Sequence, residues 1–260
     1  MIRVLVNGAL GRMGSEVVKK VCAEADLELA AVVDIKEANI ALENGSTMTT
    51  QTDLVAAIQA CAPDVVVDFT RPDVVMENLR KVLKLGVRAV VGTTGFKQAD
   101  LDELDALAKE NNTALLIAPN FALGAVVMMK LACEAAKYFP HVEIIEKHHN
   151  NKVDAPSGTA LMLADAIKEI APNKFYVYGR SGFCGKRNQN EIGIHAVRCE
   201  NVVGEHEIIF SGDFETVTLS HQATDRSVFA EGAVKACFFI ATKPKGLYDM
   251  NDVINGNYYA

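Results

Sequence analysis

The fold is decided at residues 2–14, which read IRVLVNGALGRMG. The run from Ile2 to Val6 is predicted as a buried strand, and after a glycine-rich turn apolar residues recur at helical spacing from Met13 to Cys22. A second apolar run, Leu27 to Val33, ends at Asp34. Strand, turn, helix and strand in this order predict a βαβ unit, whose two strands lie parallel in one sheet.

The same alternation of strands and helices continues to about residue 120. Apolar runs that predict strands lie at residues 65–67, 89–91 and 114–117, and helical spacing lies between them at 75–83 and 101–107. These strands are apolar throughout, as is typical of a parallel sheet covered on both faces. The sequence therefore predicts an α/β protein whose N-terminal part is a Rossmann-like, doubly wound parallel sheet.

The pattern changes after about residue 121. Helices are predicted at 123–138 and 157–170, and strands at 142–146, 192–198, 202–210 and 215–220, with a turn at Gly212-Asp213. This part is expected to be an α+β domain with an open, mixed and mostly antiparallel sheet. A last helix at 227–240 is expected to pack back on the first part, after which no strand pattern follows. The expected domains are therefore residues 1–120 with 228–260, and residues 121–227.

The composition argues against several classes of partner. The chain of 260 residues has 26 Lys and Arg against 33 Asp and Glu, a formal net charge of -7, so no nucleic acid or anionic membrane is expected as the main partner. Every apolar run is far shorter than the roughly 18 residues of a membrane span. No signal peptide is evident. No two cysteines form a C-x-x-C pair. We expect a cytoplasmic protein with reduced thiols, in which an anion must meet local positive groups or backbone N–H donors.

The glycine-rich turn is the first candidate binding site. Its spacing is G-x-x-G-x-x-G and not G-x-G-x-x-G, and a plain strand-to-helix turn would also explain it. Asp34 favours a dinucleotide, because a carboxylate at the end of the second strand can accept hydrogen bonds from the ribose hydroxyls of NAD. Arg12 and Lys36 could reach the 2′-phosphate of NADP, so NADH or NADPH is the expected cofactor, although Lys36 also fits an ordinary exposed lysine. The candidate residues here are Gly8, Ala9, Leu10, Gly11, Arg12, Met13, Asp34 and Lys36.

Two further loops follow the carboxyl ends of predicted parallel strands, where open α/β sheets bind ligands. Their short polar side chains and backbone groups suit a nicotinamide ring and its carboxamide, although turn formation alone would explain either loop. The candidate cofactor residues in them are Gly92, Thr93, Thr94, Ala118, Pro119, Asn120 and Phe121.

The densest polar cluster runs from residue 146 to residue 159. A metal site is not expected there, because adjacent histidines on an extended segment point in opposite directions and no recognisable ligand set is complete. A solvated polar loop is a second alternative. Against it, Ser157-Gly158-Thr159 opens a helix whose free N–H groups suit a carboxylate, while His148 and Lys152 can supply charge and protons near neutral pH.

Together these segments resemble the 4-hydroxy-tetrahydrodipicolinate reductase (dihydrodipicolinate reductase) family over essentially the whole chain. The matching motifs are Gly-Arg-Met-Gly at residues 11–14, Gly-Thr-Thr-Gly-Phe at 92–96, Ala-Pro-Asn-Phe at 118–121, His-His-x-x-Lys-x-Asp-Ala-Pro-Ser-Gly-Thr-Ala at 148–160 and Gly-Leu-Tyr-Asp-Met at 246–250. The resemblance implies reduction of a cyclic dicarboxylate by NADH or NADPH with loss of water, in lysine biosynthesis.

The resemblance also implies roles for single residues. His148 would be the general acid/base, Lys152 a proton donor and His149 a substrate contact, while Gly158 and Thr159 would bind a substrate carboxylate. Residues 1–120 and 228–260 would form the dinucleotide-binding domain. Residues 121–227 would bind the substrate and join the chains of a homotetramer.

Two alternatives to this reductase remain. Another NAD(P)-dependent oxidoreductase of a small carboxylate is the nearer one, but no tyrosine has the Tyr-x-x-x-Lys spacing of short-chain dehydrogenases, and no cysteine lies in the reactive setting of a semialdehyde dehydrogenase. A non-catalytic NAD-binding sensor is the other, although His148 and Lys152 would serve no purpose in it.

Overall fold

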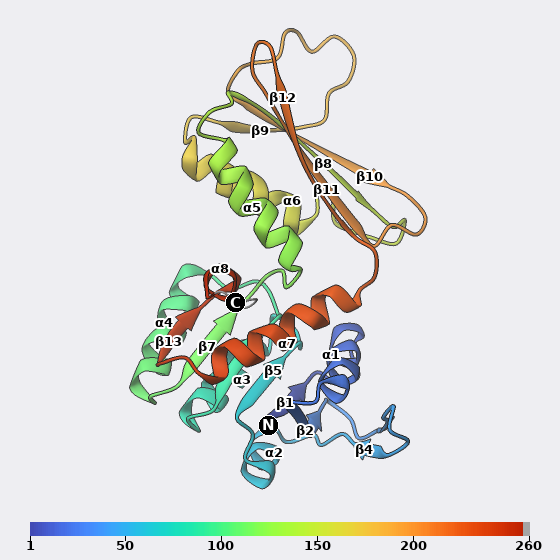
Figure 1. The fold of residues 1–260 in the computed structure, drawn as a ribbon, viewed down its shortest axis with the longest axis vertical. Coiled ribbons are helices and arrows are strands. Elements are labelled where there is room, and N and C mark those ends of the chain that lie inside the picture. Colours follow the sequence, from blue (N-terminus) through green and yellow to red (C-terminus); the bar gives the residue numbers. More distant parts are fainter. Residues whose placement is uncertain (257–260) are drawn as a thin grey trace. The chain divides into compact units, whose positions relative to one another are not determined.

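The structure is a computed structural model that describes residues 1–256. The chain forms two compact units (Figure 1). The first consists of Met1–Leu123 together with residues 227–256, and the second consists of Gly124–Arg226. Each unit has its own sheet and its own hydrophobic core.

Six parallel strands form the sheet of the first unit, in the order β13-β7-β6-β5-β1-β2. The strands are β1 (Ile2–Asn7), β2 (Leu27–Val33), β5 (Val65–Asp68), β6 (Arg88–Val91), β7 (Ala114–Ile117) and β13 (Gly246–Tyr248). The strand order reverses between β1 and β5, and ligands bind open α/β sheets at such a point. The predicted doubly wound sheet is thereby confirmed.

Helices cover both faces of this sheet. They are α1 (Arg12–Ala23), α2 (Leu54–Cys61), α3 (Val75–Lys84), α4 (Gln98–Glu110), α7 (Ser227–Ala241) and α8 (Met250–Asn255). One core cluster joins α2, α3 and α4 to the sheet through side chains such as Leu79 and Leu104, which are fully buried. On the other face α7 packs against α1 and the sheet, as the sequence predicts for the last long helix.

Five short elements of the first unit are missing from the sequence prediction, among them the helix α8. Helix α2 and the short hairpin of β3 (Asn39–Ala41) and β4 (Thr47–Thr49) were not predicted. The expectation that no strand follows the last long helix is wrong, because β13 pairs with β7 at the edge of the sheet. Three residues are too few to show a strand pattern, so β13 depends on its pairing for its structure.

The second unit has a five-stranded sheet in the order β12-β11-β8-β10-β9. The strands are β8 (His141–His148), β9 (Phe175–Tyr178), β10 (Glu191–Arg198), β11 (Gly204–Ser211) and β12 (Thr216–Ala223). Strand β10 pairs in parallel with β8 and β9, whereas β11 pairs antiparallel with β8 and β12. The sheet is mixed as predicted but not mostly antiparallel, because the parallel strand β9 was not predicted.

The helices α5 (Leu123–Ala135) and α6 (Gly158–Ile170) pack on one face of this sheet (Figure 1). The alternation of buried and half-buried residues along β8 reflects this one-sided cover, since even-numbered residues such as Ile144 point into the core. Glu146 and His148 lie on the same covered face. The sheet therefore places two polar side chains beside α6.

Across residues 1–256, no helix is long and apolar enough to cross a membrane. The six cysteines, all of which lie in this range, are free thiols.

Candidate active site

The glycine-rich turn after β1 lets a ligand approach the backbone closely. Gly8 has a φ of 83°, and a Cβ there would lie 2.7 Å from the carbonyl oxygen of Phe69. A Cβ at Gly14 would lie 2.0 Å from the carbonyl oxygen of Gly8. Glycine is required at both positions, as in a turn that receives a pyrophosphate.

Hydrogen bonds to the end of β2 hold this turn. The N–H groups of Gly8 and Ala9 donate to the Val33 carbonyl at 2.9 and 3.1 Å. Leu10 N–H donates to Asp34 Oδ2 at 2.8 Å. Asp34, which the sequence predicts as a ribose ligand, therefore also positions the turn, and the N–H groups of Gly8, Ala9 and Leu10 are engaged within the protein.

The start of α1 offers other N–H groups to an anion. Its N-cap residue is Gly11, which provides no side-chain cap. Helix geometry leaves the N–H groups of Arg12 and Met13 without intrahelical acceptors, and the helix dipole favours negative charge at this end. The turn therefore fits the pyrophosphate of a dinucleotide, with its donors at the start of α1.

A pocket of about 720 Å³ lies beside the turn and is lined by residues at the ends of β1 and β2, after β5, and on α2 and α3. Four predicted cofactor residues contribute to the lining, namely Gly8, Leu10, Gly11 and Asp34. Lys36 and Arg12 are exposed and do not line it. The volume is in the usual range for sites that bind a small molecule or cofactor.

The loops after β6 and β7 meet around the ring of Phe69. A Cβ at Gly92 would lie 2.0 Å from that ring, and the rings of Phe69 and Phe121 have centroids 5.6 Å apart. Thr93 is buried, whereas Thr94 and Pro119 are exposed. The structure therefore brings the two predicted nicotinamide loops together.

In the second loop, the Ala118 N–H donates to the Val91 carbonyl at 3.0 Å. Asn120 is half-buried, and its Oδ1 accepts from the Ala122 N–H at 2.8 Å. The backbone of this loop is thus tied to the end of β6 and to its own turn.

Asp68, at the end of β5, was not predicted as a site residue. Its side chain is almost wholly buried. The carboxylate accepts hydrogen bonds from the side chains of Asn7 (2.8 Å), Asn78 (3.2 Å), Thr70 (2.7 Å) and Thr93 (3.2 Å), and from the Thr70 N–H (3.0 Å). Asp68 therefore holds the ends of β1, β5 and β6 in one arrangement. An acidic residue that ends an apolar strand was the sequence signal available for it.

In the second unit, His148 lies at the end of β8 beside the buried carboxylate of Glu146. His148 Nδ1 is 2.5 Å from Glu146 Oε2. Arg198 Nη1 donates to both oxygens of Glu146, at 3.0 and 2.9 Å, and Arg198 Nη2 donates to Oε1 at 3.0 Å. Burial lowers the pKa of His148 below its ordinary value, although the adjacent Glu146 raises it.

Helix α6 begins beside this histidine. Its N-cap is Ser157, whose Oγ accepts from the Ala160 N–H at 3.2 Å. A Cβ at Gly158 would meet no atom within 4 Å, so there is open space in front of the first turn. The geometry suits a carboxylate at Gly158 and Thr159, as the sequence predicts.

The segment between His148 and α6 carries the remaining predicted residues. Lys152 is half-buried, and its Nζ lies 2.8 Å from Asp154 Oδ1. His149 Nδ1 is buried and has no hydrogen-bond partner in the described structure, while its Nε2 lies 3.4 Å from Arg226. Lys152 and the two histidines thus share one short segment next to the start of α6.

His206, on β11, was not predicted as part of this site. Its ring lies edge-on to that of His148, with centroids 5.2 Å apart, and its Nε2 is 3.0 Å from Ser157 Oγ. Burial, helped by the charge of His148, lowers the pKa of His206 to about 3. His206 is therefore a neutral partner beside the candidate acid/base.

The described part of the chain offers no metal centre as an alternative to this site. Among residues 1–256, no group of three or more His, Cys, Asp or Glu is arranged to hold a metal ion.

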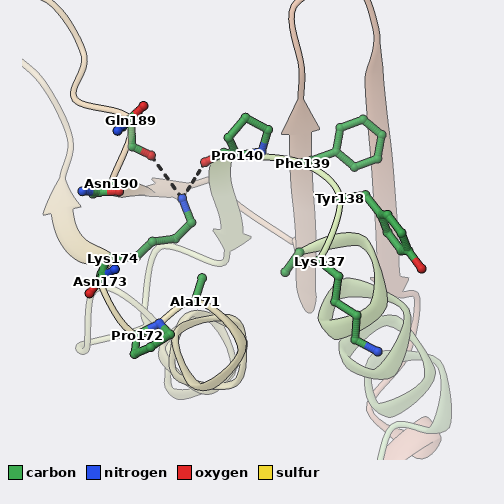
Figure 2. A pocket seen from close by; sticks show the side chains of 11 residues that line it. Lys137, Tyr138, Phe139, Pro140, Ala171, Pro172, Asn173, Lys174, Gln189 and Asn190 are labelled. Atoms are coloured by element: carbon green, nitrogen blue, oxygen red, sulfur yellow. Dashed lines mark hydrogen bonds between the residues drawn. The ribbon is translucent and has the colours of Figure 1, made fainter.

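A pocket of about 420 Å³ lies between the ends of α5 and α6 and contains no predicted site residue. Figure 2 shows its lysine, Lys174, with Nζ donating to the carbonyls of Pro140 and Gln189 at 2.5 and 3.2 Å. This lysine has a structural role, because it ties two loops together.

Comparison with known proteins decides the family. Residues 2–121 match the family described as dihydrodipicolinate reductase, N-terminus, and residues 124–254 match dihydrodipicolinate reductase, C-terminus. The chain belongs to the dihydrodipicolinate reductase family.

Individual members of the family are similar over nearly the whole chain. The 4-hydroxy-tetrahydrodipicolinate reductase of Syntrophomonas wolfei is 40% identical, and the match covers 97% of this chain and 98% of that protein. The 4-hydroxy-tetrahydrodipicolinate reductase of Listeria monocytogenes is 45% identical, and the match covers 89% of this chain and 91% of that protein. A solved structure of dipicolinate-bound dihydrodipicolinate reductase from Paenisporosarcina is 35% identical, with a TM-score of 0.81, covering 96% of this chain and 97% of that one.

Membership of the dihydrodipicolinate reductase family confirms the resemblance, the α/β fold class and the NAD(P)H-dependent oxidoreductase that the sequence predicts. The roles of single residues and the choice between NADH and NADPH stay predictions.

Proposed function

We propose that the chain reduces 4-hydroxy-tetrahydrodipicolinate to tetrahydrodipicolinate in lysine and diaminopimelate biosynthesis. Substrate, NAD(P)H and one proton give product, NAD(P)⁺ and water. The observation that carries the proposal is the pairing, within the second unit, of a histidine and a lysine with a helix N-terminus suited to carboxylate. The dipicolinate-bound relative supports a small dicarboxylate as the ligand class.

The first unit would hold the cofactor, and the reduced nicotinamide supplies the hydride when bound. The N–H groups of Arg12 and Met13 would bind the pyrophosphate, and Asp34 would accept hydrogen bonds from the adenosine ribose. The loops that begin at Gly92 and Ala118 would orient the nicotinamide. Because Asp34 suits NAD while Arg12 and Lys36 suit a 2′-phosphate, the proposal includes use of both NADH and NADPH.

The second unit would bind the substrate and move its protons. One carboxylate would lie at Gly158 and Thr159 in front of α6, and His149 would contact the substrate. Lys152 would donate the proton that the reduced substrate requires, and His148 would act as general acid/base. These positive and neutral donors provide the local site that an anion needs on a chain of net charge -7.

The proposal includes a homotetramer assembled through the second unit. Both helices of this unit pack on one face of its sheet, and the alternation along the strands places Ile145, Ile209 and Val197 on the other face. This face has no helix, and its apolar residues lie among ion pairs such as Lys147–Glu205, a mixture that suits contact with a second copy of the chain. Light scattering coupled to size exclusion tests this part, and a monomer at micromolar concentration would contradict it.

The proposal also places the enzyme in the cytoplasm, supported by the six free thiols. Fractionation of the source cells tests this part, with the protein expected in the cytoplasmic fraction.

The reaction itself is tested by a coupled assay. A dihydrodipicolinate synthase makes the substrate from pyruvate and aspartate semialdehyde, and the absorbance of NADH or NADPH is followed after the protein is added. We expect oxidation that depends on the synthase and that is lost in His148→Gln. Binding of NADH without oxidation of either cofactor would contradict the enzyme and favour a sensor.

A further inference from the structure

Glu146 is fully buried, and its carboxylate contacts three separate parts of the second unit. Its Oε2 faces His148 Nδ1, its Oε1 accepts from the Ser157 N–H at 3.0 Å, and both oxygens accept from Arg198. A buried carboxylate costs several kcal/mol unless it is paired and hydrogen-bonded. Glu146 meets both conditions, and it contacts the candidate acid/base directly.

We propose that Glu146, held by Arg198, is a positioning residue that fixes the ring proton of His148 on Nδ1 and leaves Nε2 to exchange a proton with the substrate. This inference rests on the function proposed for His148. A carboxylate that receives two arginine donors is an acceptor only, so the ring nitrogen that faces it must carry a proton. Glu146 touches no substrate atom in this arrangement and acts through the imidazole.

The surroundings of the other ring nitrogen support this assignment. A Cβ at Gly204 would lie 3.1 Å from His148 Nε2, so glycine at this position keeps the space beside Nε2 narrow but unblocked. His206 contacts the edge of the same ring and is neutral, because its pKa is about 3. His148 can therefore gain a proton without a second positive histidine beside it.

The same carboxylate also links the acid/base to the carboxylate-binding end of α6. Ser157 donates its N–H to Glu146 and caps α6 through its hydroxyl. Arg198 Nη2 donates to the Asp154 carbonyl at 2.6 Å, within the loop that leads to α6. One buried group thus sets the position of His148 relative to the first turn of α6.

Glu146→Gln tests the proposal, because an amide has a single acceptor oxygen. Arg198 and the Ser157 N–H both require that oxygen, so the amide NH₂ would face His148 Nδ1 and donate to it. The proton of the neutral imidazole would then move to Nε2. We expect kcat to fall by at least about a hundredfold, since the wrong tautomer of a catalytic histidine is severely inactivating, with KM changing by less than about threefold.

Glu143→Gln is the matched control. Glu143 lies on the same strand, three positions earlier, and also pairs with arginine and histidine: Arg180, Arg187 and His195 lie 2.9, 2.8 and 2.7 Å from it. It lies on the opposite face of the sheet from Glu146. Because Glu143 shares the face proposed for assembly, light scattering checks first that Glu143→Gln has the oligomeric state of the unsubstituted enzyme. We then expect its kcat to stay within about twofold of the unsubstituted value.

Nitrogen-15 NMR of histidine-labelled protein reads the tautomer without any assay of activity, with His148 assigned by the signals lost in His148→Gln. In the unsubstituted protein, His148 should show a protonated Nδ1 and an unprotonated Nε2 at neutral pH. A proton on Nε2 in that protein would overturn the inference, as would Glu146→Gln with kcat reduced less than threefold. If the unsubstituted enzyme oxidises no NAD(P)H, the proposed function fails, while the tautomer still tests the geometry.

Discussion

Asp68 in the first unit and Glu146 in the second are both buried carboxylates near the ends of central strands, yet different donors stabilise them. The donors to Asp68 are side-chain amides, hydroxyls and one backbone N–H, all of them uncharged. Glu146 accepts from the guanidinium of Arg198, and its Oε2 lies against the imidazole of His148. Neutral donors suffice to fix the loops that follow β1, β5 and β6, whereas the arginine and the histidine beside the second carboxylate are what the role proposed for Glu146 requires.

This contrast predicts that substitutions in the second unit act mainly on turnover and those in the first mainly on cofactor binding. The largest effect is expected for Lys152→Ala. Loss of a proton donor should lower kcat by about a hundredfold or more while KM rises much less, because the donor acts mainly in the transition state. Steady-state kinetics with saturating NADH measures both constants.

Lys147→Ala is the control for Lys152→Ala. Lys147 lies on β8 and pairs with Glu205 at 2.5 Å, outside the candidate site, so its loss should leave kcat nearly unchanged. Near-normal turnover in Lys152→Ala would contradict the proposal that Lys152 is the proton donor.

Asp68→Ala should act on the first unit. It leaves five donors without their acceptor, two of them buried and three half-buried, so the free energy of unfolding should fall by about 3 kcal/mol. Because Thr93 and the ends of β1 and β6 lose their anchor, the Kd for NADH should rise about tenfold, which corresponds to about 1.4 kcal/mol. Urea titration and cofactor fluorescence provide the two measurements.

Asp73→Ala, in an exposed Arg71–Asp73 pair on the same loop, should change neither quantity. An unchanged Kd in Asp68→Ala would show that Asp68 stabilises the sheet without shaping the cofactor site.

The pH dependence of stability should distinguish the second unit further. Folding lowers the pKa of His206 from 6.5 to about 3, so the unfolded chain binds the extra proton between these values. His206 therefore contributes stability that is fully present above about pH 6.5 and is lost as the pH falls toward 3, with a slope of up to about 1.4 kcal/mol per pH unit. Urea unfolding is measured at several pH values between about 4 and 7, the range in which the two forms of the chain differ in protonation of His206. The free energy of unfolding should depend less steeply on pH in His206→Gln than in the unsubstituted protein. Equal slopes in the two proteins would mean that His206 titrates normally.

The smallest effect is expected at the cofactor ribose. Lys36 is exposed and lies outside the pocket lining, so Lys36→Ala should lower kcat/KM for NADPH by only about threefold and leave that for NADH unchanged, as suits a screened surface charge. In the unsubstituted enzyme the two cofactors should differ by less than about tenfold in kcat/KM. A larger preference for either would show that Asp34 or Lys36 dominates recognition of the ribose.

The sequence predicts most of the fold because its strong signals are local. The βαβ unit of residues 2–34 and the long helices follow from apolar periodicity alone. The strand β13 and helix α2 are short, and pairing or packing determines them more than their own pattern does. The parallel strand β9 is also short and was not predicted for the same reason. Without it, the balance of parallel and antiparallel pairs in the second sheet could not be predicted either.

The candidate site was predictable only where its residues are close in sequence. His148, Lys152 and Gly158 lie on one segment, and the periodicity of two along a strand could have placed Glu146 on the face of His148. Arg198 is 52 residues from Glu146, and His206 is 49 residues from Ser157. No local pattern joins such pairs, so the hydrogen-bond network around His148 forms only when β8, β10 and β11 are assembled.

Transfer of a labelled hydride tests the central claim most directly. The enzyme is supplied with NADH or NADPH that carries deuterium on the transferred position of C4, together with freshly synthesised substrate, and the product is analysed by mass spectrometry. We predict that one deuterium enters tetrahydrodipicolinate for each cofactor oxidised, and that Lys152→Ala slows its appearance. Product without deuterium, or no product with either cofactor, would contradict the account.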